Sequence, residues 1–147
     1  MAKYDLHFQA IPEDELQGFK FFTRAFNRTI GVRGINKLLN LWTKMFMTTK
    51  GSDPTNLERG TEFPLLIGSN ITSIQDVRDI VMLSIGDCTA QITELQRVDT
   101  PDPDETLRTA VLLQFESDAR DRIDVRVGIT NVANEEAAVL IPTLIQV

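Results

Sequence analysis

Few side chains in this sequence of 147 residues could perform catalysis or hold a metal ion. His7 is the only histidine and Cys88 the only cysteine, so a Ser-His-Asp triad could form only around His7, and cysteines alone could not build a zinc site. Cys88 falls among apolar residues at helical spacing, which favours a buried, unreactive thiol over a nucleophile. The sequence contains no phosphate-binding glycine loop and no H-E-x-x-H zinc motif. We therefore expect no enzymatic activity, no cofactor and no metal site.

Two groups of carboxylates require separate consideration. Glu58 and Glu62 are nominal candidates for glycoside hydrolysis, which uses two acids on either side of a sugar. They fall in a segment rich in Gly, Pro, Asn and Asp that we expect to be an ordered loop, and the chain has only one Trp and one Tyr to stack on a sugar. Asp102, Asp104 and Glu105 lack the glycine and the ligand spacing of an EF-hand loop. We expect this acidic run to be a solvated linker.

Charge is unevenly distributed along the chain. The formal net charge is -6, yet residues 1–51 hold eight basic and four acidic side chains, a net of +4, which leaves -10 for residues 52–147. All five lysines lie in the first part, and no acid occurs between Glu15 and Asp53. Aromatic residues share this basic stretch, and aromatic and arginine side chains together are typical of protein interfaces. The candidate protein-binding side chains of this region are Phe19, Phe21, Phe22, Arg24, Phe26, Arg28 and Arg33.

Three interpretations of the basic, aromatic stretch stay open at this point. It could form a protein interface, a hydrophobic core with a solvated basic rim, or a platform for single-stranded nucleic acid. The chain carries no RNA-binding or DNA-binding motif, so the protein interface is favoured and nucleic acid is the alternative. Trp42 and Phe46 belong to the same stretch and are compatible with all three interpretations.

Hydrophobic periodicity predicts a single α+β domain over residues 34–147, preceded by an extended N-terminal docking arm over residues 1–33. Apolar residues after Ile35 recur at three-residue and four-residue steps, which predicts a helix over 35–48. A second, longer helix is expected from Ile74 to Leu95, and its Gly86 leaves open a bend, a close contact or an early end near Asp87. The arm lacks a clean period but contains many large apolar side chains, so we expect it to become ordered against a partner.

After the acidic linker the hydrophobic period changes to two, as expected for strands. Connections of about five residues, at 117–121 and 131–135, predict hairpins, and so a three-stranded antiparallel meander with the two helices covering one face. The alternating segments are 107–115, 123–130 and 139–145.

Pro142 confines the last of these strands to an edge of the sheet, or at least turns that position outward, because proline cannot donate a backbone hydrogen bond. The proline either protects this edge against aggregation or marks an edge that accepts a strand from another chain. Both interpretations stay open. The candidate protein-binding residues of this strand are Val139, Leu140, Ile141, Leu144 and Ile145.

Three sequence segments carry a resemblance to a known family. Residues 34–39 (Gly-Ile-Asn-Lys-Leu-Leu) followed by Trp42, residues 47–54 (Met-Thr-Thr-Lys-Gly-Ser-Asp-Pro) and residues 60–63 (Gly-Thr-Glu-Phe) resemble the small baseplate wedge proteins, or sheath initiators, of contractile-tailed bacteriophages. The order of elements is similar from about residue 34 to the end. The Glu-Pro-Arg triplet that many members carry between the second helix and the first strand is absent, and residues 94–97 (Glu-Leu-Gln-Arg) stand near that place.

The resemblance implies a structural protein of the virion. In that family the arm and the first helix hold other baseplate wedge proteins around the tail hub and tube, and the terminal strands offer an edge to the tail sheath protein. It implies a location in the tail baseplate, assembled in the cytoplasm of the bacterial host, and no apolar run is long enough to suggest a membrane partner. Some family members are labelled lysozyme-like, and no residue pattern in this sequence supports such an activity. The alternative is a nucleic-acid-associated structural protein that uses the basic, aromatic N-terminal region.

Overall fold

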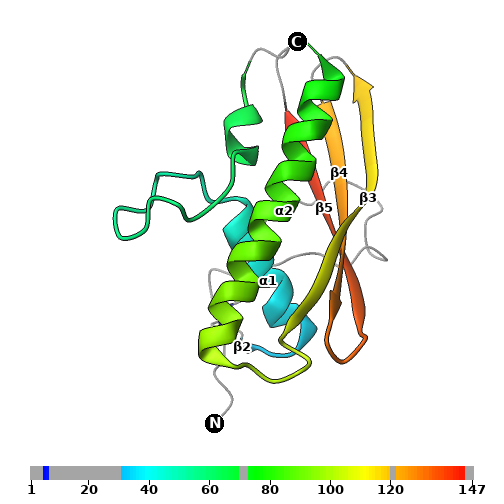
Figure 1. The fold of residues 1–147 in the computed structure, drawn as a ribbon. Helices are drawn as coiled ribbons and strands as arrows, with labels where there is room; N and C mark the ends of the chain where they lie inside the picture. Colours follow the sequence, from blue (N-terminus) through cyan, green and yellow to red (C-terminus); the bar gives the residue numbers. More distant parts are fainter. Residues whose placement is uncertain (1–4, 7–30, 70–72, 120–121, 145–147) are drawn as a thin grey trace.

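The computed structural model describes residues 5–6, 31–69, 73–119 and 122–144, which contain two long helices and a three-stranded antiparallel sheet (Figure 1). This arrangement confirms the predicted α+β fold class with two main helices packed on a C-terminal meander. The elements in chain order are β1 (Asp5–Leu6), β2 (Gly31–Val32), α1 (Ile35–Phe46), the 3-10 helix η2 (Phe63–Leu66), α2 (Ile74–Asp99), β3 (Leu107–Ala119), β4 (Arg122–Asn131) and β5 (Glu136–Leu144).

Helix α1 supplies the largest side chains of the core. Trp42 stacks on Phe46 with ring centroids 4.7 Å apart, and Phe46 meets Phe63 of η2 at 4.5 Å. All three rings are buried. The aromatic residues at the end of the basic stretch therefore belong to the hydrophobic core, and the core interpretation is the correct one for Trp42 and Phe46. The helix ends at Phe46, two residues earlier than predicted.

Helix α2 is continuous over 26 residues and extends past the predicted end at Leu95. Gly86 neither bends nor ends it, and a Cβ added at Gly86 would meet no atom within 4 Å. The turns on either side retain the helix because their apolar side chains pack against α1 and β3. The buried apolar residues of α2 are Val77, Val81, Ile85, Cys88 and Ile92.

The sheet has the strand order β3-β4-β5, and both strand pairs are antiparallel (Figure 1). Side chains of β4 alternate strictly between buried and half-buried positions, because one face of the sheet packs against the helices. Strand β3 continues to Ala119, beyond the predicted limit at 115, since Ser117 and its neighbours stay paired with β4 through the backbone. The predicted five-residue connection at 117–121 is therefore wrong.

The two ends of the predicted N-terminal arm come together. Asp5 pairs with Val32 and Leu6 pairs with Gly31 in a short antiparallel ladder. The rest of the segment between them lies outside the described residues, as do the candidate docking residues Phe19, Phe21, Phe22, Arg24, Phe26 and Arg28.

Candidate functional site

Strand β5 forms a regular outer edge of the sheet. Its pairing with β4 runs without interruption from Arg122 opposite Leu144 to Thr130 opposite Glu136. Within the described part of the chain, no strand pairs with the other side of β5. The predicted edge position of this strand is therefore confirmed for the residues that the structure describes.

Strand β3 forms the other outer edge, and its pairing with β4 is irregular. Register shifts or bulges occur at three places along its 13 residues. Bulges bend and twist a strand, and they interrupt the row of hydrogen-bonding groups that an added strand would need. Of the two outer strands, β5 is therefore the one suited to pairing with another chain. The shifts in β3 lie between Leu107 and Thr109, between Leu112 and Gln114, and between Ser117 and Ala119.

Pro142 determines which backbone groups of β5 face outward. It lies opposite Asp124, and opposite pairs in an antiparallel ladder alternate between those that exchange two hydrogen bonds and those that exchange none. Proline has no N–H, so its position belongs to the pairs whose backbone groups point away from β4. Ala138 and Leu140, four and two residues earlier, share this orientation. Among the described residues, the outer side of β5 thus offers the N–H and C=O groups of Ala138 and Leu140, followed by a missing donor at Pro142.

The structure separates the candidate side chains of β5 into two sets. Val139 and Ile141 are only 3% and 2% exposed and pack in the core, so the prediction that their side chains contact a partner is corrected. They hold the strand on the sheet because they face the helices. Leu140 is half-buried on the opposite face, where a partner could reach it. Leu144 ends β5, and Ile145 lies outside the described residues.

The outer sheet face beside Leu140 is mixed, because Arg126 of β4 lies directly opposite Leu140 and apolar residues lie closer to the β4–β5 hairpin. Ala138 lies opposite Gly128, and Gly128 lies opposite Val111 on β3. A Cβ at Gly128 would come within 2.9 Å of Leu113 Cδ1, so the glycine leaves room for the Leu113 side chain. Leu113 and Val111 are 52% and 47% exposed. A strand added to β5 would therefore contact Ala138 and Leu140 on this face, with Arg126 on the next strand, and the two β5 side chains favour apolar residues at alternate positions of the partner.

An ion pair within β4 borders this surface. Arg122 donates from Nε to Asp124 Oδ1 and from Nη2 to Asp124 Oδ2, both at 2.9 Å. These residues lie opposite Leu144 and Pro142, at the end of β5. The bidentate geometry pairs the two charges with each other, so this end of the edge presents a neutral polar boundary.

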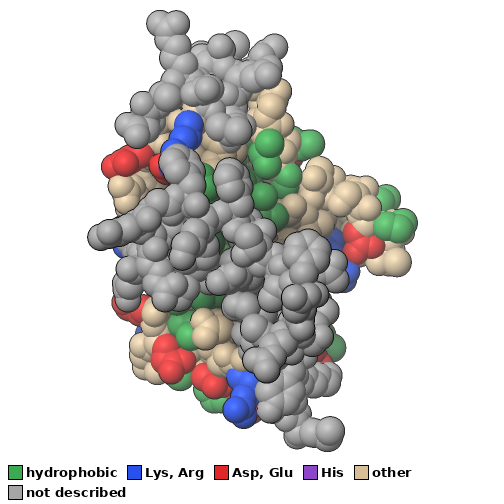
Figure 2. Space-filling model, turned by 180° about the vertical axis from the view of Figure 1, so that it is seen from behind, with side chains coloured by type: hydrophobic (Ala, Val, Ile, Leu, Met, Phe, Trp, Pro, Cys, Tyr) green, Lys and Arg blue, Asp and Glu red, His purple; other side chains and the backbone are tan. Residues whose placement is uncertain are grey.

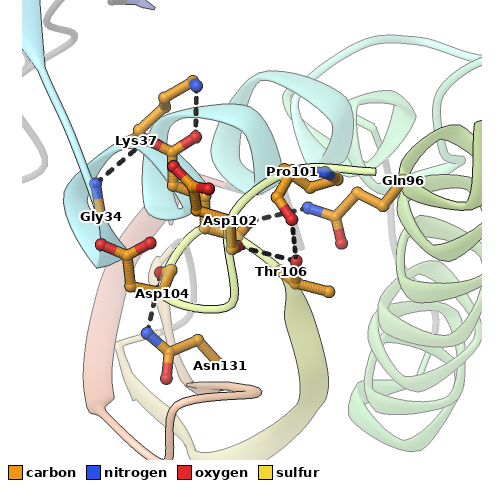
Figure 3. A network of polar contacts seen from close by, with 9 residues as sticks. Gly34, Lys37, Gln96, Pro101, Asp102, Asp104, Thr106 and Asn131 are labelled. Atoms are coloured by element: carbon orange, nitrogen blue, oxygen red, sulfur yellow. Dashed lines mark hydrogen bonds and ion pairs between the residues drawn. The ribbon is translucent and has the colours of Figure 1, made fainter. Parts of the chain in front are cut away.

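A polar network connects the start of α1 to the linker before β3 (Figure 3). Lys37 donates to one carboxylate oxygen of Glu105, and the Gly34 backbone N–H donates to the other at 3.3 Å. Gln96 of α2 donates to the Glu105 carbonyl at 2.8 Å and accepts from the Leu107 N–H at 2.8 Å. Glu105 is only 9% exposed. The prediction of a solvated linker is therefore wrong for its last residue. Glu105 is held inside the fold by Lys37, the Gly34 N–H and the side-chain amide of Gln96.

Asn131 holds the β4–β5 hairpin against the same linker. Its buried side chain donates from Nδ2 to the Asp104 carbonyl at 2.8 Å and to Glu135 Oε2 at 2.7 Å. Its Oδ1 accepts from the Glu135 N–H at 2.8 Å. This asparagine fixes the point at which β5 begins. Sequence analysis missed its role, and the only available signal was an amide residue at the start of a predicted hairpin connection.

The loop after α1 projects from the body of the molecule (Figure 1, Figure 2). Gln91 of α2 clamps its base by accepting from the Gly60 N–H at 2.9 Å and donating to the Gly60 carbonyl at 2.8 Å. Thr61 donates from Oγ1 to the carbonyl of Phe46, the last residue of α1, at 2.7 Å. Gly60 and Thr61 belong to the sequence pattern that resembles sheath initiators, and here both have a structural role at the end of a helix.

Of the residues considered for catalysis, Glu58 and Cys88 are in settings typical of structural residues, and His7 lies outside the described residues. Glu58, in the projecting loop, is exposed and forms a surface ion pair with Lys50 at 3.2 Å. Cys88 is completely buried on the core face of α2, and burial raises the pKa of its thiol. In the ranges that the structure covers, no three potential metal ligands are grouped together, and no helix has both the length and the apolarity to cross a membrane.

The basic stretch is only partly described. Arg33 is exposed at the end of β2. Lys37 is paired with Glu105 and Lys50 with Glu58, so two of its lysines already have carboxylate partners within the chain. These two positions therefore contribute less to a phosphate-binding surface than the sequence alone suggests.

Comparisons with known proteins add no relative to this description. No family model matches the chain, and neither the curated proteins nor the solved structures contain a match.

Proposed function

We propose that this chain is a non-enzymatic assembly protein that accepts a β-strand from another protein at the β5 edge. The observation that carries the proposal is the contrast between the two outer strands. Strand β5 keeps an unbroken register with β4, whereas the register of β3 shifts at three places. Backbone hydrogen bonds would supply the affinity, and the side chains of Ala138 and Leu140 would select the partner's side chains.

The proposed partner is the tail sheath protein of a contractile-tailed bacteriophage, and the proposed location is the virion baseplate. The resemblance of residues 34–63 to sheath initiators supports this context. Strand addition suits the task because backbone hydrogen bonds connect subunits strongly without requiring a rigid side-chain interface. The N-terminal segment, with its basic and aromatic residues, would contact other wedge proteins and the tail hub or tube.

Leu140→Pro tests the edge directly. The N–H of Leu140 faces the free edge, so proline at this position removes a donor for the partner without removing a hydrogen bond to β4. Leu140→Ala is the matched control, since it shortens the same side chain and keeps the N–H. In phage particles that contain the chain, we expect Leu140→Pro to yield tail tubes without polymerised sheath, and Leu140→Ala to yield sheathed tails. Electron microscopy of the particles measures both.

Circular dichroism and thermal melting establish that each variant is folded before assembly is scored. Should Leu140→Pro unfold the chain, Ala138→Pro removes the preceding outward donor and takes its place. Sheathed tails assembled with a folded proline variant would disprove strand addition at β5. Purified virions that lack the chain by mass spectrometry would disprove the baseplate location.

A further inference from the structure

We propose that Pro142 makes the β5 edge selective for a foreign strand over a second copy of this chain. The inference deepens the proposed function and rests on its open edge. Without such a device, two copies could pair β5 with β5, since an unprotected regular edge is a general template for self-association. Pro142 is exposed and interrupts the outward row of donors at a single place.

In a symmetric dimer, the backbone donor that is missing at Pro142 removes one interchain hydrogen bond in each half of the interface. Two copies that pair through the same edge are related by a two-fold axis, and their strands are antiparallel. In the register that pairs β5 over its full length, Leu140 lies opposite Leu140 of the second copy, and Ala138 lies opposite Pro142 of the second copy. The Ala138 carbonyl then lacks a donor, and the two-fold axis repeats the loss in the other half of the interface.

Sliding the strands does not recover the full interface. A register that leaves out Pro142 pairs only the segment from Glu136 to Leu140, and the rest of β5 then has no partner. A foreign strand meets Pro142 once, because it brings no equivalent proline by symmetry. A foreign strand can therefore span all of β5 and lose one interchain hydrogen bond, whereas pairing with a second copy loses two.

The two outer strands thus have different protection. The register shifts along β3 disfavour any added strand, whether foreign or from a second copy. On β5 the proline penalises the symmetric pairing more than the asymmetric one. This difference is the expected arrangement for an edge that must stay free until a different protein arrives.

Pro142→Ala tests the inference through self-association of the full chain. We expect the wild-type chain to stay monomeric and Pro142→Ala to dimerise on the order of tenfold more tightly, because two interchain hydrogen bonds are restored. Sedimentation equilibrium over a series of protein concentrations measures the change. Pro54→Ala, at an exposed loop proline away from the sheet, is the matched control and should behave as the wild type.

A second variant shows which edge is used. Adding Leu140→Pro to Pro142→Ala should abolish the gained dimerisation, since it removes another outward donor of β5. A Pro142→Ala chain that associates no more tightly than the wild type would overturn the inference, as would dimerisation that persists in the double variant. These results differ from failure of the proposed function: normal sheath on particles with Leu140→Pro would disprove strand addition and leave the effect of Pro142 on self-pairing intact.

Discussion

Lys37 of α1 forms an ion pair with Glu105, although 68 positions separate the two residues in the sequence. The other carboxylate oxygen of Glu105 accepts from the Gly34 N–H. One buried carboxylate thus joins the start of the first helix to the linker just before β3. The contact ties the start of α1 to the chain segment that leads into β3.

Loss of the Glu105 carboxylate should destabilise the fold. In Glu105→Ala, the ammonium group of Lys37, which is largely buried, and the Gly34 N–H lose their acceptor, and we expect the free energy of unfolding to fall by about 2 to 4 kcal/mol. Urea unfolding monitored by circular dichroism measures this change. The double variant with Lys37→Met should lose less than the sum of the two single variants, because no unpaired ammonium group is left behind. Additive losses would show that the pair contributes little.

Gly60 should be the least replaceable glycine of the projecting loop. Its φ of 100° is unfavourable for other residues, and a Cβ there would lie 2.3 Å from the Thr48 carbonyl oxygen. We expect Gly60→Ala to lower the free energy of unfolding by more than about 3 kcal/mol. Gly51→Ala is the control: φ is also positive at 84°, but a Cβ would meet no atom within 4 Å, so the loss should be about 1 to 2 kcal/mol. Equal losses in chemical denaturation would contradict the steric explanation.

The thiol of Cys88 should be unreactive in the native protein. Burial raises its pKa, and the nearby charge of Asp87 raises it further, so the nucleophilic thiolate is scarce at neutral and mildly alkaline pH. Its Sγ also lies 3.5 Å from the Trp42 carbonyl in the core. We expect a thiol-specific reagent such as Ellman's reagent to label the chain at pH 8 only after unfolding in urea. Rapid labelling of the native chain would show that α2 opens or that the thiol is accessible.

The helices and strands were predictable because the hydrophobic period reports which side of an element is buried. The predictions were wrong where an element is held by backbone pairing, or by partners distant in the sequence, and not by a regular pattern of apolar residues. Ser117 stays in β3 through its pairing with Ile123, and no hydrophobic period signals that extension. Gly86 lies inside a continuous helix, because packing on both sides of it outweighs its low helix propensity.

The candidate site was predictable only at the level of its strand. Alternation along 139–145 indicated a strand, and Pro142 indicated an edge. Both sets of alternating side chains in this strand are largely apolar, so the period did not indicate which set faces the core. Packing against the helices decided that Val139 and Ile141 face inward and that Leu140 faces outward.

By itself, the sequence determined the order of the elements and the edge position of the last strand, because periodicity and the missing N–H of proline are local properties. Tertiary structure alone decided that Glu105 is buried beside Lys37 and that the register of β3 is irregular where that of β5 is regular. These features depend on residues far apart in the chain. The interactions that stabilise them form only when the helices and the sheet pack together.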